Sequence, residues 1–205
     1  MKKLCILLMI LMMAAVLYTS CTNESTEDVK QNEPSMSKEM NYEELVRHYA
    51  EKHQVSAGDA EEAMIQMHIL EDDPDESDAA KYRILSIPLE VDCKYQPMLE
   101  LYMEIDGNDE NWTVSRVKGA AFVGTVNDQS WQFAGNVAFW LRENRQIEYD
   151  VNGDFGQNNR ASAYMELDIE EDGSEGRIAC KMPEKAGELR NTAYCSQHDW
   201  VTYGE

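Results

Sequence analysis

The sequence predicts an α+β protein: a short N-terminal helical hairpin followed by a seven- or eight-stranded antiparallel β-barrel or β-sandwich, arranged as a meander. Two observations lead to this fold class. Between residues 41 and 70, apolar side chains recur every three or four positions, the period of a helix with one buried face. From about residue 82 onward, apolar and polar residues alternate in short segments separated by turn residues, which is typical of antiparallel strands.

The helical hairpin starts with a capping signature, Asn41 followed by Glu44. A turn at 54–58 then separates the first helix from a second, which we expect over Asp59–Leu70 with Ser56 or Asp59 as its cap. Methionines and alanines at helical spacing supply the buried face of this second helix.

Seven segments of alternating apolar residues predict strands, and the residues from Tyr194 to Tyr203 predict an eighth. Two dipeptides, Gly107-Asn108 and Asn152-Gly153, are turn signals between strands. The seven segments are, in chain order, 85–91, 99–105, 112–126, 131–141, 147–151, 163–169 and 178–182.

The composition limits the partners of the protein. The formal net charge is −21 at pH 7, which repels nucleic acid and anionic membrane surfaces. Residues 71–78 hold six acids in eight positions, so we expect 71–81 to be an exposed linker between the helices and a single β domain over 82–205.

The first twenty residues have the composition of a signal peptide. Lys2 and Lys3 precede fourteen uninterrupted apolar residues, Leu4 to Leu17, a run too short to cross a bilayer, which takes about 20 residues. We therefore expect residues 1–20 to be removed on export.

The end of this segment, Tyr18-Thr19-Ser20-Cys21, resembles the lipobox of bacterial lipoproteins, in the tolerant version found in Bacteroidetes. The resemblance implies that Cys21 is acylated, so that the lipid bilayer of the outer membrane is a partner. Residues 21–40 would form a disordered tether. The acids just behind Cys21 partly match a surface-export signal, which favours the cell surface over the periplasmic face; ordinary secretion is the alternative.

The remaining cysteines, Cys93, Cys180 and Cys195, permit at most one internal disulfide. Cys180 alternates in phase with apolar neighbours and is expected to be a buried free thiol. A bridge from Cys195 to Cys93 or to Cys180 is left open.

The motif Glu166-Leu167-Asp168-Ile169-Glu170 resembles the catalytic signature of laminarinase- and lichenase-type β-glucanases. The resemblance implies that Glu166 is a nucleophile and Glu170 an acid/base, with Asp168 between them. The alternative, which we favour, is a half-exposed strand in an acidic chain, because apolar and acidic residues alternate in any such strand.

Two further patterns could bind metal. Asp150, Asn152 and Asp154 place oxygen ligands at alternate positions, as a calcium loop does, although a tight Asn/Asp/Gly turn has the same composition. Met64, Met67 and His68 could bind copper, but methionines at this spacing usually belong to a core. We expect neither a metal nor a cofactor.

Three aromatic residues, Tyr102, Trp140 and Tyr164, lie out of phase with the inward residues of their strands. Exposed on a sheet, they could stack on a sugar or contact a protein. If the helical hairpin covers that face, they belong to a core instead.

These observations favour a non-enzymatic, lipid-anchored envelope or cell-surface module that binds a glycan or a protein. One rival is a glycan hydrolase that uses Glu166, Asp168 and Glu170. The other rival is a lipocalin-like carrier of a small apolar ligand, which needs a hollow interior.

Overall fold

The computed structural model of the chain describes residues 33–70, 80–92, 96–108, 111–123, 125–126, 129–142, 145–158 and 163–203. These residues belong to one compact unit, Glu33–Glu205. The expected signal peptide, Cys21, the tether up to residue 32 and the acidic block 71–78 lie outside the described residues. Within the described residues, no helix combines the length and the apolar character needed to span a membrane.

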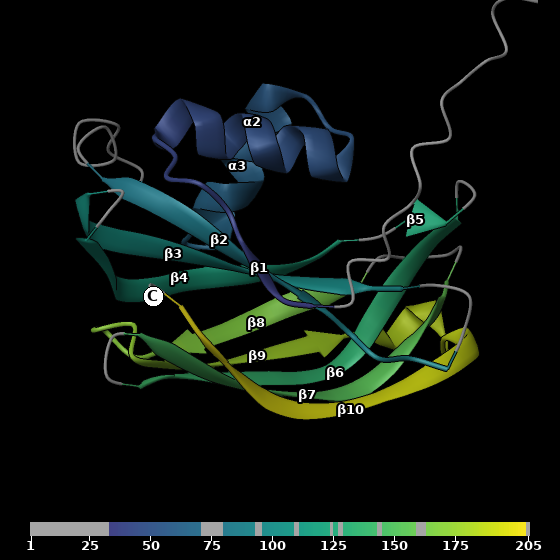
Figure 1. Cartoon of the computed structure of the whole chain (residues 1–205). Coiled ribbons are helices and arrows are strands. Elements are labelled where there is room, and N and C mark those ends of the chain that lie inside the picture. Colours follow the sequence, from purple (N-terminus) through teal and green to yellow (C-terminus); the bar gives the residue numbers. More distant parts are fainter. Residues whose placement is uncertain are drawn as a thin grey trace, which may run out of the picture. The chain divides into compact units, whose positions relative to one another are not determined.

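The fold is α+β, as predicted, and the described residues form two α-helices and two antiparallel sheets (Figure 1). The first sheet has the order β1-β2-β3-β4 and the second has the order β10-β7-β6-β9-β8, with β5 beside β6. The elements are β1 (Ser35–Met36), α2 (Tyr42–His53), α3 (Ala57–Gln66), β2 (Lys81–Pro88), β3 (Met98–Asn108), β4 (Asn111–Val123), β5 (Thr125–Val126), β6 (Gln129–Arg142), β7 (Gln146–Gln157), β8 (Tyr164–Ile169), β9 (Glu175–Lys181), the 3₁₀ turn Glu184–Ala186 and β10 (Arg190–Thr202).

The sheets form a sandwich and not a closed barrel. Among the described residues no ladder joins the two sheets; single contacts tie their edges, such as the Val117 N–H donating to Gly173 O at 3.2 Å. The predicted meander is right for β2-β3-β4 and wrong for the second sheet. There the β8–β9 hairpin lies on the far side of β6, and β10 returns to pair with β7.

The predicted helix caps are confirmed. The Asn41 side chain accepts from the Glu44 N–H at 2.9 Å, and the Glu44 carboxylate accepts from the Asn41 N–H at 3.3 Å. Ser56 caps α3. That helix ends at Gln66, four residues earlier than predicted, because His68 adopts a left-handed conformation with φ 57° that turns the chain.

The expected disordered tether is wrong for residues 33–40. β1 pairs with β2, and Met40 exchanges backbone hydrogen bonds with Tyr82 at 2.9 Å. Met40 is only 5% exposed. The apolar side chains of Met36 and Met40 and the unpaired edge of β2 explain why this segment docks.

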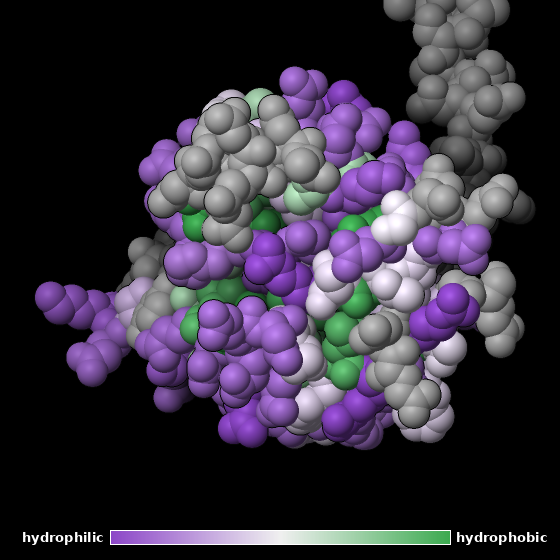
Figure 2. Space-filling view, turned by 90° about the vertical axis from the view of Figure 1, so that its left-hand side faces the viewer, coloured by the Kyte–Doolittle hydropathy of each residue, from purple (hydrophilic) through white to green (hydrophobic). Residues whose placement is uncertain are grey.

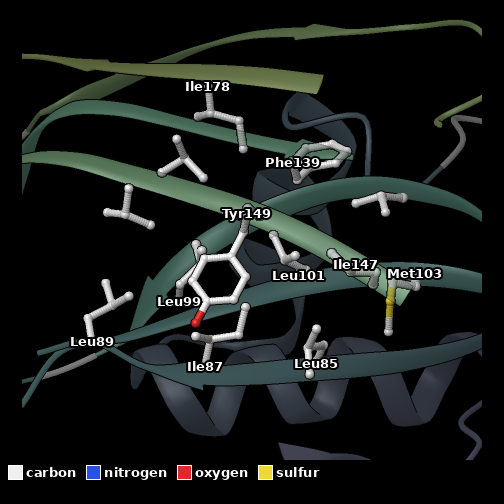
Figure 3. Packing of buried hydrophobic residues seen from close by; sticks show 14 of the residues in the cluster. Leu85, Ile87, Leu89, Leu99, Leu101, Met103, Phe139, Ile147, Tyr149 and Ile178 are labelled. Carbon is white, nitrogen blue, oxygen red and sulfur yellow. The ribbon is translucent and has the colours of Figure 1, made fainter. Parts of the chain in front are cut away.

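Two hydrophobic cores result from this layering. The larger core fills the space between the sheets, where leucines and isoleucines of β2 and β3 meet Phe139, Tyr149 and Ile178 (Figure 3). The smaller core lies between the helices and the first sheet. The first sheet is therefore covered on both faces, whereas in Figure 1 no described helix lies below the second sheet.

The turn predicted at Asn152-Gly153 is wrong, since both residues lie in the middle of β7. Gly153 pairs with Gly135 of β6, and a Cβ on Gly153 would lie 2.5 Å from the Ala134 carbonyl oxygen and 2.7 Å from the Phe133 ring. This glycine provides room for an aromatic ring against the strand, a role that glycine also has in sheets.

Cys180 and Cys195 are buried free thiols. They lie in one row across the sheet, separated by Gly135 and Gly153. Three strand spacings put their Cα atoms roughly 14 Å apart, too far for a disulfide, which needs less than about 7 Å. Burial raises the pKa of Cys180 to about 12 and that of Cys195 to about 11. Cys93 lies outside the described residues.

Candidate functional site

The candidate site is the outer face of the second sheet, which is the face turned away from the core. Along β7, Tyr149 and Val151 point into the core while Glu148, Asp150 and Asn152 point outward. Inward and outward side chains also alternate in β10, β6, β9 and β8 of this sheet. Because β10 curves upward at both ends in Figure 1, this outer face is convex.

The fold brings most of the sequence candidates onto this one face. Cross-strand pairing arranges the outward residues in rows, from β10 through β7, β6 and β9 to β8. The rows are Tyr194–Asp154–Ala134, then Ser196–Asn152–Asn136–Ala179–Glu166, then His198–Asp150–Ala138–Arg177–Asp168, and then Trp200–Glu148–Trp140–Glu175. At the end of the β8–β9 hairpin, Lys181 pairs with Tyr164. The Tyr164 side chain lies outside what the structure describes.

Aromatic rings stand out on this face. Trp200 is 60% and Tyr194 59% exposed, and with Val55 they are the exposed large hydrophobic residues of the described chain. Trp140 is half-buried, with the Arg142 guanidinium 6.0 Å from the centre of its ring. Trp200 and Trp140 share a row two strands apart, which is roughly 10 Å. The sequence analysis missed Tyr194 and Trp200, although Tyr194 lies between the buried residues Ala193 and Cys195.

Polar side chains surround the rings. The His198 ring nitrogens lie 3.5 Å from a carboxylate oxygen of Glu148 and 3.5 Å from one of Asp150. Asn152 Nδ2 donates to the Tyr194 hydroxyl at 3.0 Å. The face thus presents hydrogen-bond acceptors and donors between its rings.

Pockets flank the sheet at its ends. Segment 182–189 borders the outer face around a pocket of about 590 Å³, which also touches Asp154 and Thr192. A smaller pocket of about 260 Å³ lies at the β8–β9 turn, at the end viewed in Figure 2, where the surface is mainly hydrophilic. Because Arg116 and Lys118 share the lining of this second pocket with Glu170 and Glu171, its charges favour no single sign of ligand.

The three acids of the glucanase-like motif are exposed on β8 or directly after it. Glu166 forms an ion pair with Lys181. Glu166 and Glu170 are four residues apart, which corresponds to roughly 13–14 Å along a strand, whereas glycosidases hold their two carboxyl groups about 5–9.5 Å apart. The distance between Glu166 and Glu170 is therefore longer than the sequence analysis implied.

The calcium-loop pattern does not form a loop. Asp150, Asn152 and Asp154 lie on β7, where successive side chains of one face are roughly 7 Å apart and cannot wrap around one ion. Within the described ranges, no three His, Cys, Asp or Glu side chains are grouped to hold a metal. Met64 and Met67 are buried core residues, while His68 is exposed beyond the end of α3.

Tyr102 is not part of an exposed face, because the helices cover it completely. Its hydroxyl donates to Glu100 at 2.8 Å, and His48 Nε2 lies 3.4 Å from the other oxygen of that carboxylate. Glu100 is 0% exposed. Burial alone would raise the pKa of Glu100, but the hydrogen bonds from His48 and Tyr102 outweigh it and lower the pKa. This cluster joins α2 to β3.

Acid is expected to destabilise the unit in two steps. Burial lowers the pKa of His53, which favours its neutral form, so stability falls as the pH drops below the ordinary histidine value of about 6.5. The lowered pKa of Glu100 gives stability that is present above about pH 4.3 and lost as the pH falls through the folded value. Urea unfolding from pH 8 to pH 3 measures both steps. A free energy of unfolding that rises on acidification would contradict this account.

Comparison with known proteins identifies no relative: no family model, no curated protein and no solved structure matches this chain.

Proposed function

We propose that this protein is a non-enzymatic, lipid-anchored binding module of the cell envelope that holds a glycan on the outer face of its second sheet. The observation that carries the proposal is the grouping of Trp140, Tyr194 and Trp200 with hydrogen-bonding side chains on a face that no described helix covers.

A sugar ring has C–H faces that stack on aromatic rings and hydroxyls that need hydrogen-bond partners. The row Trp200–Glu148–Trp140 offers both, since a carboxylate lies between two rings. Asn136, Asn152 and Ser196, two rows farther along the strands, are exposed and can bond further hydroxyls. The face therefore suits an extended chain that lies across the strands.

A glycan fits this face better than a protein does. Charged residues are depleted from the centres of protein interfaces, whereas Asp150 and Arg177 lie at the centre of this one. Acids also outnumber bases here, and the whole chain is strongly acidic. Neutral glycans or amino sugars are therefore better ligands than sulfated or uronic ones.

The packed interior supports a surface site over an apolar carrier. Phe139 and Tyr149 fill the space between the sheets (Figure 3). Farther along the core, the Phe133 ring lies 4.5 Å from the Phe122 ring and 4.8 Å from the Phe155 ring, centre to centre. A carrier would need a cavity of about 300 Å³ or more there. The separation of Glu166 and Glu170, roughly 13–14 Å along an extended segment, likewise supports a binder over a hydrolase.

The proposed localisation is inferred from the first 21 residues. A basic start, a short apolar run and Ser20-Cys21 support acylation of Cys21 and anchoring in the outer membrane. The acids that follow Cys21 support the cell surface. A glycan receptor there would meet its ligand outside the cell.

Binding to a panel of neutral, amino and acidic oligosaccharides tests the proposal. The wild type should bind a neutral or amino glycan without cleaving it. Since an aromatic stacking contact contributes about 0.5–1.5 kcal/mol, the double variant Trp140→Ala/Trp200→Ala should bind roughly 10- to 100-fold more weakly. Val55→Ala, which removes an exposed hydrophobic side chain from the helical side, should not change the affinity.

Three outcomes would overturn the proposal: binding of no glycan in the panel, equal affinity of the double variant and the wild type, or release of reducing sugar. Circular dichroism confirms that each variant is folded. Binding of a protein instead of a glycan would leave the outer face as a site but would contradict the ligand class.

A further inference from the structure

The outer edge of β10 is long and almost uncharged. Among the residues that the structure describes, β10 is the last strand of its sheet, and it pairs with β7 without interruption from Ala193 to Thr202. In a chain with 28% charged residues, that stretch contains one acid, Asp199, and neither lysine nor proline. Natural edge strands usually carry such residues because an unprotected edge pairs with another strand.

Two hydrogen bonds show which backbone groups of β10 face outward. The Tyr203 N–H donates to the Arg145 carbonyl on the β7 side, whereas the Trp200 N–H donates to the side chain of its neighbour Asp199. Backbone groups alternate in direction along an antiparallel strand. Tyr194, Ser196, His198 and Trp200 therefore direct their N–H and C=O groups to the free edge.

We propose that β10 pairs antiparallel with β10 of a second copy of this chain, about a two-fold axis at Gln197. In this register Tyr194 lies opposite Trp200 of the partner subunit, and Ser196 lies opposite His198 of the partner subunit. All four residues have outward-facing backbone groups, so every facing pair can exchange both hydrogen bonds.

The two exposed rings specify this register. Tyr194 and Trp200 each lie three residues from Gln197, so a two-fold axis there places unlike rings side by side twice. An axis at Ser196 would put Trp200 opposite Thr192, and an axis at His198 would put it opposite Ser196. Of these three axes, only the one at Gln197 places both exposed rings beside each other.

The negative charge of the chain affects how strongly two copies associate. Asp199 must release the Trp200 N–H when the strands pair. Two copies of a chain with net charge −21 repel each other, so added salt should strengthen the association by screening. Anchored in one membrane, the copies meet at high effective concentration, and pairing would join their outer faces.

Sedimentation of a soluble chain that begins at residue 22 tests the proposal, since this chain retains the whole compact unit. The wild type should form dimers that strengthen with salt. Ser196→Lys places a charge on the free edge and should weaken the dimer tenfold or more. Ala179→Lys adds the same charge in the same row but on β9, inside the sheet, and should leave the dimer unchanged.

A disulfide trap tests the register. The double variant Ser196→Cys/His198→Cys should oxidise to a covalent dimer, whereas Tyr194→Cys/Ser196→Cys should not, because its cysteines do not face each other. A monomer at all concentrations and salts would overturn the proposal, as would a dimer that Ser196→Lys leaves intact. Because no glycan is present, either result is independent of sugar binding.

Discussion

Replacing Glu100 with alanine is expected to lower the free energy of unfolding by roughly 3–5 kcal/mol, the range for removing one member of a buried polar pair. Glu100 accepts from Tyr102 at 2.8 Å and lies 3.4 Å from His48 beneath α2. The variant leaves the Tyr102 hydroxyl buried without its acceptor and opens a cavity. Urea denaturation at pH 7 measures the loss.

Two controls separate this effect from general sensitivity. Glu100→Gln keeps the shape and an acceptor for Tyr102, so it should lose less stability, and it should abolish the acid step assigned to Glu100. Asp168→Ala removes an exposed carboxylate and should change the free energy of unfolding by no more than about 0.5 kcal/mol. A Glu100→Ala variant as stable as the wild type would show that this cluster does not hold α2 on the sheet.

Cys21→Ser is expected to move the protein from the membrane to the soluble fraction. Each buried methylene of an acyl chain contributes about 0.8 kcal/mol, so losing all chains removes the anchor. Fractionation of cells and incorporation of labelled palmitate measure the change. Cys5→Ser, in the same N-terminal segment, should leave both unchanged. If the Cys21→Ser protein stayed with the membrane and the wild type incorporated no label, the lipoprotein proposal would be wrong.

The sequence predicts the elements of this fold well because their signals are local. Asn41 and Glu44 cap a helix through contacts within one turn, and the alternation in 99–105 marks a strand. Which strands pair is not a local property. Nothing in the alternation of β8 and β9 indicates that this hairpin lies beside β6. The strands themselves were therefore predicted correctly, but their order in the second sheet was not.

Errors at individual residues have specific physical causes. Asn152-Gly153 has the composition of a turn, but Gly153 serves to admit the Phe133 ring, a contact between different strands. Tyr102 is out of phase with its core neighbours because a second core lies on its side of the sheet. Trp140 is likewise out of phase with the inward residues of its strand, yet the helices do not cover its face. Because the two residues show the same pattern in the sequence, only the tertiary structure distinguishes them.

The most direct test of the outer face as the ligand site is backbone and indole NMR of the labelled protein, titrated with the best glycan of the panel. The largest shift changes are expected at Trp140, Trp200 and Asp150. No change is expected at Tyr42 and Val55, which lie on the helical side. Shifts confined to the helices or to the interior residues of β3, with none on the outer face, would contradict this assignment.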